Sequence, residues 1–218
     1  FPIPNVLDEL KKIANYKVFI DLDVTNAFHQ VPIDDFTSKL LSVQCPIGHY
    51  EPIFMPEGIA PASLILMKTM LRIFREHLSW LIVIHDNILL LAHDYSDAFH
   101  KLKIIMKQCK KNNLYLKLSK SNFGVDKVEF FGYVCTNGTY TLSDTRKEQV
   151  ANIPFPESIK QMQRFLGMSV YFKPFIFNFS NKTAQLHEMT KKDFNWKTTT
   201  WNVDYKQIFN SFKQDIVN

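Results

Sequence analysis

Three aspartates lie in apolar sequence that favours strands, where a carboxylate has few structural uses. Asp21 and Asp23 alternate with apolar residues in the segment 17–24, which is the period of a β-strand. The alternation places both carboxylates on one face, where they repel each other unless water or a cation separates them. The third, Asp86, interrupts the apolar segment 81–92. As the natural partner of Asp23, Asp86 would complete a pair of hard oxygen ligands of the kind that divalent ions prefer.

Each of these carboxylates also has a simpler interpretation. Asp and Asn both tolerate positive φ and bond their own backbone, so Asp86-Asn87 could merely turn a hairpin between two buried arms. His85 would then belong to the same turn. Asp21 and Asp23 could lie on an edge strand that exposes them to water. The metal interpretation therefore requires that the strand carrying Asp23 lie beside the hairpin carrying Asp86.

Composition indicates a packed globular protein. The 218 residues are 46% hydrophobic and 14% aromatic, which allows one large domain or a few subdomains around a continuous core. The apolar run Trp80–Ala92 is broken by polar residues and is too short to span a membrane. The first four residues lack the features of a signal peptide and an initiator Met, which indicates a piece of a longer polypeptide.

Cysteine usage bears on the compartment. Three cysteines cannot all pair, and none has C-x-x-C spacing: Cys45, Cys109 and Cys135. This pattern favours a reduced protein without structural zinc. We therefore expect an intracellular location and no membrane partner.

Charge is strongly segregated along the chain. Residues 1–100 hold 7 Lys+Arg against 12 Asp+Glu, whereas residues 101–218 hold 19 against 9. This division suggests a metal site in the first half and a polyanionic partner for the second. For any single lysine, a solvated helix face is the simpler interpretation. The lysines that we expect to face outward on one helix are Lys101, Lys103, Lys107, Lys110 and Lys111.

Periodicity predicts an α+β body to about residue 142, followed by an all-helical subdomain. In the body we expect helices over 4–15, 61–77 and 96–112, and strands over 17–24, 40–45, 50–55, 81–92 (a hairpin), 114–118, 128–134 and 140–142. In the subdomain we expect helices from Ser143 onward, with the later ones over 158–174, 181–190 and 203–217.

An ordered series of sequence blocks runs almost from end to end. Phe1-Pro2-Ile3-Pro4 matches F-P-[LI]-P, and residues 22–30 match L-D-[LV]-x-x-[AG]-[YF]-H-Q. The later blocks are related to G-x-Y-E-x-x-x-M-P-F-G at 48–58, Y-x-D-D-I-L at 84–89, L-K-L-S-K at 116–120, E-F-F-G-Y at 129–133, and F-L-G through N-[FY]-S at 165–180. On these blocks the chain resembles the reverse transcriptases of gypsy-type long-terminal-repeat retrotransposons, which are related to retroviral polymerases.

The resemblance implies a right-hand polymerase fold and RNA-directed DNA polymerase activity. Residues 1–142 would form a palm with partial fingers at about 31–61, and residues 143–218 a helical thumb and the start of a connection to an RNase H region. The implied partners are an RNA or DNA template with its primer, deoxynucleoside triphosphates, and the RNase H and integrase parts of a polyprotein. The implied cofactor is a pair of Mg²⁺ ions, with Mn²⁺ as an alternative.

The resemblance also assigns roles to individual residues. Asp23 and Asp86 would be the catalytic metal ligands, helped by the backbone carbonyl of Val24. The incoming nucleotide would meet Val24, Phe28 beneath its sugar, and Gly58. The nucleic acid would be bound by Phe131 and Gly132 at the primer end, by Lys120, and by Gln163, Gly167 and Tyr171 along one face of a thumb helix.

The sequence departs from the family's pattern at the centre of the site. Asn87 stands where the family has a second Asp, and Ile84, His85 and Glu57 are further departures. One unit-charge pair at ~4 Å is worth ~4 kcal/mol at an effective dielectric of ~20. If ~2–4 kcal/mol is lost from the transition state, the reaction slows roughly 30- to 1000-fold. The alternative function is a catalytically silent, retroelement-derived subunit that binds nucleic acid or acts as a scaffold.

Overall fold

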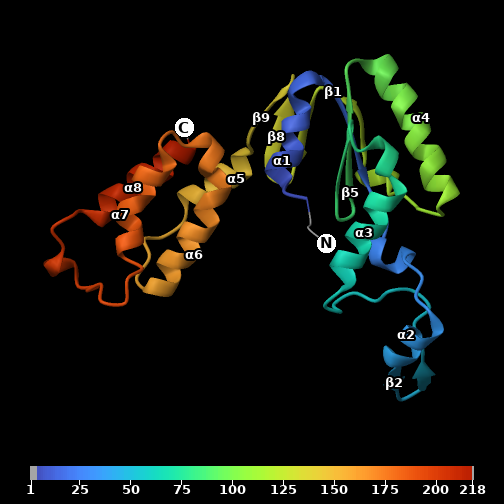
Figure 1. Ribbon diagram of the computed structural model, residues 1–218, viewed down its shortest axis with the longest axis horizontal. Coiled ribbons are helices and arrows are strands. Elements are labelled where there is room, and N and C mark those ends of the chain that lie inside the picture. The colour runs from blue at the N-terminus through green and yellow to red at the C-terminus, as the bar shows by residue number, and fades with distance from the viewer. Residues whose placement is uncertain (1–3, 218) are drawn as a thin grey trace. The chain divides into compact units, whose positions relative to one another are not determined.

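The computed structural model describes residues 4–217, so the first three residues of the opening sequence block lie outside the described part of the chain. The chain divides into two compact units, which meet in sequence between Thr141 and Leu142 (Figure 1). Helices combine with antiparallel sheet, and the predicted α+β class is confirmed. No helix within residues 4–217 has the length and apolar character needed to cross a membrane.

The first unit is built on a four-stranded sheet in the order β4-β5-β1-β6. β4 (Leu81–Ile84) and β5 (Asn87–Ala92) form the predicted hairpin, and β5 pairs antiparallel with β1 (Val18–Asp23). β6 (Asn122–Val125) lies on the other side of β1. The expected strand at 114–118 is reduced to a single bridge between Leu116 and Val24, because the chain then turns into a 3₁₀ segment.

Two helices cover one face of this sheet and bury alternate residues of β1. α3 (Ala62–Ile73) and α4 (Tyr95–Lys111) share a hydrophobic core with the residues of β1 that alternate with its aspartates. The opposite face of the sheet lies near α1 (Val6–Leu10), which contacts β4. Asp21 and Asp23 belong to that opposite face, because successive side chains of a strand point to opposite sides.

Lys101 contradicts the expected outward set of lysines on α4. Its side chain is buried, and its Nζ donates to the Leu91 carbonyl at 2.9 Å and to Asp97 Oδ2 at 2.8 Å. The ammonium lies 4.9 Å from the ring centroid of Tyr16 and 5.4 Å from that of Trp80. A lysine can be buried when its ammonium is paired with a carboxylate, hydrogen-bonded and flanked by aromatic rings in this way. The other four predicted lysines are exposed.

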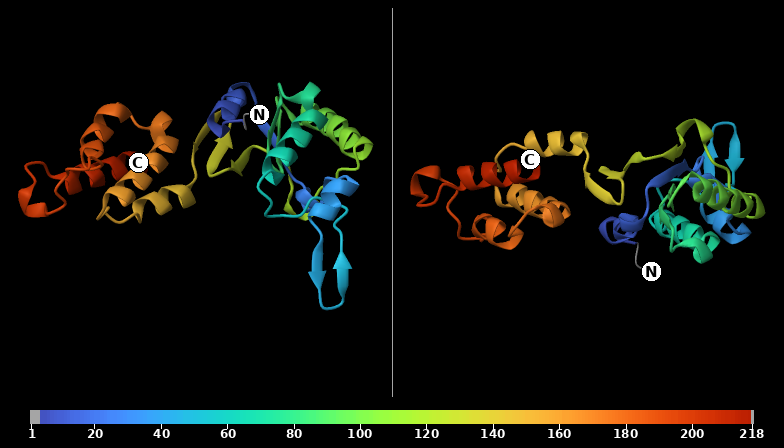
Figure 2. Two further views of the ribbon diagram at one scale, coloured as in Figure 1. Left: turned by 60° about the horizontal axis from the view of Figure 1, so that its bottom comes forward. Right: turned by 90° about the horizontal axis from the view of Figure 1, so that it is seen from above.

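The segment expected as partial fingers contains α2 (Asp35–Leu40) and a short hairpin of β2 (Val43–Cys45) and β3 (Gly48–Tyr50). This hairpin projects away from the four-stranded sheet (Figure 2). The predicted strand 40–45 began too early, and the predicted strand 50–55 overlaps β3 only at Tyr50. Leu40 ends α2, and Pro52 and Pro56 lack the N–H groups that a longer ladder would need.

A second small sheet contains β7 (Lys127–Phe130), β8 (Tyr133–Thr136) and β9 (Thr139–Leu142). The prediction of one strand over 128–134 was wrong. Phe131 and Gly132 have φ values of 52° and 79°, which reverses the chain between β7 and β8. Only the glycine of this pair signals a turn, so the strand-like composition on either side concealed it.

The second unit is helical, as predicted: α5 (Asp144–Ala151), α6 (Ile159–Ser169), α7 (Phe179–Glu188) and α8 (Tyr205–Val217). Its core centres on aromatic rings, with the centroids of Phe165 and Phe209 4.6 Å apart. α6 ends before Pro174, which lies in a 3₁₀ segment. The 3₁₀ segments of the chain are Lys11–Asn15, Ala27–Gln30, Arg75–His77, Leu118–Lys120, Val170–Phe175 and Thr198–Thr200.

Candidate active site

The sheet brings Asp23 and Asp86 to one end of the β1–β5 pair. Asp23 is the last residue of β1, and its partner across the pair is Asn87, the first residue of β5. Asp86 immediately precedes Asn87, and its carbonyl accepts a hydrogen bond of 3.0 Å from the backbone N–H of Val24. The strand carrying Asp23 therefore lies beside the hairpin carrying Asp86, which is the arrangement that the metal interpretation requires.

The turn of the hairpin is one residue shorter than the predicted one. Ile84 pairs with Asn87, so His85 and Asp86 form the turn, and Asn87, the third residue expected there, begins β5. His85 has a φ of 53° and its N–H donates to the sulfur of Met67 at 3.2 Å. Met67 is fully buried in α3, so a hydrogen bond connects the turn of the hairpin to the helical layer that covers the sheet.

The position of the turn also fixes the environment of Asn87. Its side chain is partly buried, and its Nδ2 donates to Asp86 Oδ1 at 3.3 Å. Asn87 therefore binds one of the two candidate catalytic carboxylates while lying opposite the other. A carboxylate at position 87 would be close to both.

The carboxylates of this site have no cationic side chain as a partner. Among residues 4–217, no lysine or arginine forms an ion pair with Asp21, Asp23 or Asp86. Burial raises the pKa of Asp21 to about 6; a hydrogen bond from Asn122 opposes this rise, and the charge of Asp23 adds to it. Uncompensated carboxylates of this kind are stabilised by a bound cation.

The available donors fit a hard divalent ion. The donors are the two carboxylates of Asp23 and Asp86 and the backbone carbonyl of Val24. Among the turn and loop hydrogen bonds of residues 4–217, no backbone N–H donates to this carbonyl, so it is available to a ligand. Mg²⁺ takes oxygen ligands of this type and keeps several waters or substrate oxygens in its shell. The described residues contain no group of three His, Cys, Asp or Glu side chains placed to hold a metal. The protein would therefore supply part of the shell and the substrate the rest.

Gln30 holds the segment that follows Asp23, which the sequence did not reveal. Its Nε2 donates to the carbonyls of Thr25 and Tyr115, and its Oε1 accepts from the Tyr115 N–H at 2.7 Å. Lys117 N–H donates to the Asp23 carbonyl at 2.8 Å. These hydrogen bonds hold the end of β1 and the residues after it against the segment 115–117. The only sequence signal was the position of Gln30 in a family block.

The three residues predicted to bind the nucleotide differ in how far they are exposed to solvent. The Val24 side chain is buried in the core, so only its backbone is available. Phe28 is half-buried and packs against the same core from the 3₁₀ segment that contacts α3. Gly58 is exposed in the loop before α3 with a φ of 86°. The structure therefore places Phe28 on the core that β1 shares with α3, and Gly58 on a separate loop.

The predicted nucleic-acid residues are all presented at the surface or at a turn. Phe131 and Gly132 form the tip of the β7–β8 hairpin, and Lys120 is exposed at the end of a 3₁₀ segment that contacts β1. In the second unit, the side chains of Gln163 and Tyr171 and the backbone of Gly167 are exposed. Gln163 and Gly167 belong to α6, whereas Tyr171 lies in the 3₁₀ segment after it, so the three residues do not share one helix as predicted. Phe165 and Leu166 of α6 are buried.

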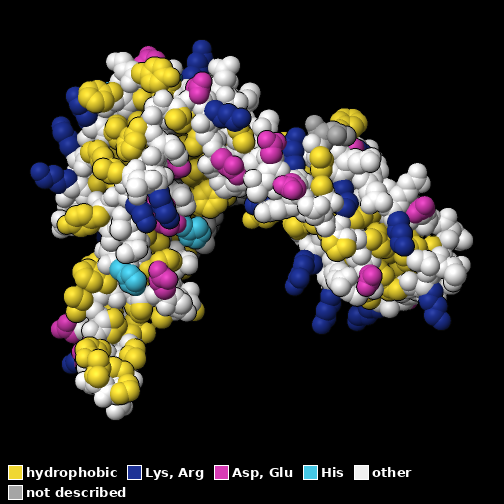
Figure 3. Space-filling model, turned by 180° about the vertical axis from the view of Figure 1, so that it is seen from behind, with side chains coloured by type: hydrophobic (Ala, Val, Ile, Leu, Met, Phe, Trp, Pro, Cys, Tyr) yellow, Lys and Arg dark blue, Asp and Glu magenta, His cyan; other side chains and the backbone are white. Residues whose placement is uncertain are grey.

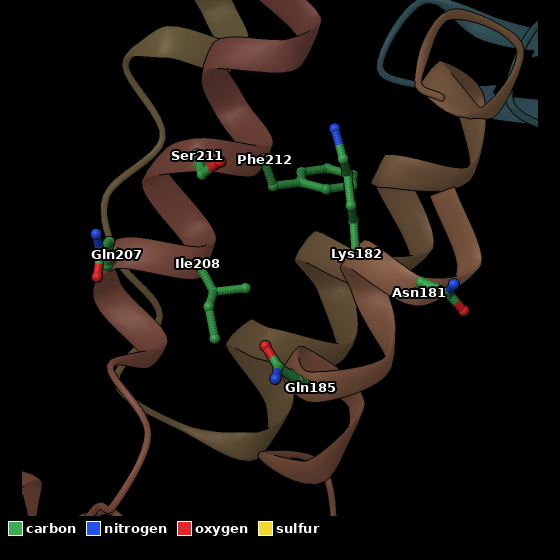
Figure 4. Close-up of a pocket in the computed structure, with 7 residues that line it drawn as sticks. All are labelled: Asn181, Lys182, Gln185, Gln207, Ile208, Ser211 and Phe212. Atoms are coloured by element: carbon green, nitrogen blue, oxygen red, sulfur yellow. The ribbon is translucent and has the colours of Figure 1, made fainter. Parts of the chain in front are cut away.

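A cavity of about 470 Å³ lies in the second unit. It opens between α7 and α8, where Gln185 and Ile208 point into the space between the two helices (Figure 4). Its one lysine, Lys182, is 2.6 Å from Asp215. The lining contains no carboxylate, so this cavity does not extend the candidate active site.

The family model described as "Reverse transcriptase (RNA-dependent DNA polymerase)" matches residues 2–135, more than half of the chain. The chain belongs to the reverse transcriptase family. The Retrovirus-related Pol polyprotein from transposon opus of Drosophila melanogaster is 29% identical over 88% of this chain and 19% of that protein. The Transposon Tf2-7 polyprotein of Schizosaccharomyces pombe is 29% identical over 100% of this chain and 16% of that protein. The chain thus spans less than a fifth of either relative.

Solved structures support the fold. The foamy viral protease-reverse transcriptase dRH in complex with double-stranded DNA aligns with a TM-score of 0.84 at 19% identity, covering 99% of this chain and 39% of that one. The same type of protein in complex with an RNA/DNA hybrid aligns with a TM-score of 0.77 at 19% identity, covering 99% and 29%. The predicted right-hand polymerase fold is therefore confirmed.

Proposed function

We propose that this reverse transcriptase domain is an active RNA-directed DNA polymerase, part of the polyprotein of a gypsy-type retrotransposon. It would add deoxynucleotides to the 3′ end of a primer paired with an RNA or DNA template. The observation that carries the proposal is the junction of Asp23 and Asp86, held together by the Val24–Asp86 backbone bond and free of cationic partners within the described residues.

The parts of the polymerase follow from the two units. Residues 1–30 and 62–142 would form the palm, 31–61 the fingers, and 143–218 the thumb with the start of the connection to RNase H. The relatives are polyproteins of which this chain matches 19% and 16%, which supports a place for this chain beside other domains. RNase H and integrase would be other parts of the same polyprotein. The ordered sequence blocks support the gypsy subtype.

The metal ligands would be the carboxylates of Asp23 and Asp86 and the carbonyl of Val24. Two Mg²⁺ ions bound there, or Mn²⁺ in their place, would supply activation of the primer hydroxyl and stabilisation of the leaving pyrophosphate. Asp21 lies on the same face as Asp23, but it precedes the sequence block 22–30 that resembles the family pattern, whereas Asp23 is the aspartate of that block. We therefore assign catalysis to Asp23 and Asp86 and not to Asp21.

The remaining residues would orient the substrates. Phe28 packs on the core beside β1, so it offers a fixed ring beneath the nucleotide sugar. The Phe131-Gly132 turn would contact the primer end, and Lys120 would contact a phosphate. The foamy viral proteins of the same fold are described in complex with double-stranded DNA and an RNA/DNA hybrid. By analogy, Gln163, Gly167 and Tyr171 would follow the minor groove of such a duplex.

Primer extension tests the proposal. The chain is incubated with an RNA template, a labelled DNA primer, deoxynucleotides and Mg²⁺ or Mn²⁺. Extension should occur and should fall at least 1000-fold in Asp86→Asn, whereas the matched variant Asp126→Asn, at an exposed position, should retain it. If the unmutated chain binds the duplex but never extends it, the silent nucleic-acid-binding subunit is the better description.

A further inference from the structure

A basic cavity of about 300 Å³ on the helical side of the first unit is not used by the proposed reaction. It lies between the end of α3 with its following 3₁₀ turn and the end of α4. Its cationic lining is Arg72, Arg75 and Lys111, and its one carboxylate is Glu76. Ile73, Gln108 and Asn112 complete the lining.

Further lysines extend this cavity into a groove. Lys68 precedes Arg72 by one turn of α3, and Lys107 precedes Lys111 by one turn of α4, which is about 6 Å along a helix axis. Both lysines are exposed, and Figure 3 shows cationic side chains along the margin of the unit where α4 lies. We call the surface formed by Lys68, Arg72, Arg75, Lys107 and Lys111 the helical groove.

The cations of the helical groove lack anionic partners within residues 4–217. None of the ion pairs formed there includes any of the five, and Glu76 is not paired either. The position of Lys111 in the last turn of α4 can be explained by the favourable interaction of a cation with a helix C-terminus. It does not account for Lys68 or Lys107, which lie at least a turn before the helix ends.

The groove and the candidate active site lie on different sides of the sheet. α3 and α4 pack against the side chains of Val18, Ile20 and Leu22, which alternate with the aspartates. Asp21 and Asp23 therefore point to the other face. A molecule in the helical groove would not be the primer–template duplex at the carboxylates.

The chemistry of the groove fits phosphate groups. Arginine presents a planar fork of donors that matches phosphate oxygens, and Gln108 offers a side-chain amide close by. Release of counterions makes a row of unpaired cations attractive to a nucleic acid backbone. A cavity of about 300 Å³ is too small to seat a duplex, so a single strand is the form that can follow it.

We propose that the helical groove binds the phosphate backbone of single-stranded nucleic acid that lies outside the polymerase site. The test compares two variants that each lose four positive charges. The groove variant carries Arg72→Gln, Arg75→Gln, Lys107→Gln and Lys111→Gln. The matched control carries substitutions at exposed, unpaired lysines elsewhere: Lys17→Gln, Lys39→Gln, Lys192→Gln and Lys197→Gln.

The measurement is the salt dependence of binding to a fluorescent, unpaired 20-nucleotide RNA. Each phosphate contact to a single strand contributes about 0.7 to the slope of log K against log salt, so the groove variant should lose about 3 from the slope. The control should keep it. Equal slopes in both variants would overturn the proposal. It would also be overturned if the groove variant lost as much affinity for poly-glutamate as for the RNA, because the groove would then fit an acidic protein partner.

Two further measurements keep the result interpretable. Extension of a short primer–template with a single-nucleotide template overhang should be the same in both variants, so failure of the proposed polymerase activity would show separately from failure of groove binding. If the groove variant does not fold, RNA carrying a photoreactive base is cross-linked to the unmutated chain instead. Cross-linked peptides should then include residues 107–112, and their absence would also overturn the proposal.

Discussion

Asp23 and Asn87 lie directly opposite each other across the β1–β5 pair. Residues opposed in this way have Cβ atoms about 4.5–5.5 Å apart, so side chains at both positions can reach one ion. The neutral amide of Asn87 therefore lies where a carboxylate could bind the same divalent cation as Asp23. This relationship makes the effect of charge at position 87 directly testable.

Asn87→Asp should raise the rate of primer extension roughly 30- to 1000-fold, because it restores ~2–4 kcal/mol of attraction to the metal-bound transition state. The measurement is single-nucleotide incorporation at saturating Mg²⁺. The matched control is Asn210→Asp, an exposed amide on α8, which should leave the rate unchanged. No gain from Asn87→Asp would sink the argument that a missing charge limits this site.

The same variant should be less stable without metal. Three carboxylates at one strand end repel one another, so the midpoint of thermal unfolding in EDTA should lie below that of the unmutated chain. Millimolar Mg²⁺ should raise the midpoint more in Asn87→Asp than in the unmutated protein, since binding stabilises only the folded state. Equal shifts would indicate that position 87 does not contact the ion.

Met67→Leu should loosen the catalytic turn. The thioether accepts the His85 N–H at 3.2 Å, and leucine fills a similar volume without an acceptor. The free energy of unfolding should fall by about 1 kcal/mol, measured in urea, because a partly buried donor loses its partner. Met70→Leu, also buried in α3, is the control and should change less. If Met67→Leu and Met70→Leu lowered the free energy of unfolding equally, the contact between Met67 and His85 would contribute no more than ordinary packing.

The free energy of unfolding should fall as the pH rises from about 4 to about 6, because Asp21 loses its proton over this range. Burial raises its folded-state pKa to about 6 from the ordinary 3.8, so the folded chain binds the proton more tightly than the unfolded chain. Its contribution is fully present below about pH 4 and is lost as pH rises through about 6. In metal-free buffer, Asp21→Asn should add on the order of 1–3 kcal/mol at pH 8 and nothing at pH 3.5. A gain that does not depend on pH would contradict this assignment.

Local periodicity was sufficient to predict the carboxylate face. The alternation around Asp21 and Asp23 is a property of consecutive residues, and the apolar arms of the hairpin needed no tertiary information to be recognised. The turn position was different. It depends on the pairing of Ile84 with Asn87, which places Asn87 in β5 even though Asp-Asn has a strong turn propensity.

Features that depend on distant segments were not predictable in this way. Lys101 is buried because Tyr16, Trp80 and the Leu91 carbonyl surround it, and no helical pattern carries that information. Gln30 likewise acts through Tyr115, a residue far along the chain. In both cases a polar side chain completes a tertiary hydrogen-bond network, which sequence periodicity cannot register.

Gln30→Glu tests whether that network holds the metal-binding end of β1. A carboxylate can still accept from the Tyr115 N–H, but it cannot donate to the carbonyls of Thr25 and Tyr115 that Nε2 now satisfies. The free energy of unfolding should fall by about 1–3 kcal/mol at pH 8, and amide exchange of Thr25, which donates to the Tyr115 carbonyl, should accelerate. Below about pH 4 the protonated carboxyl regains one donor, so part of the loss should be recovered there. Gln44→Glu, on the exposed strand β2, should show neither effect. If Gln30→Glu slows primer extension while Thr25 exchange stays unchanged, Gln30 acts on the substrate and not through the backbone that follows Asp23.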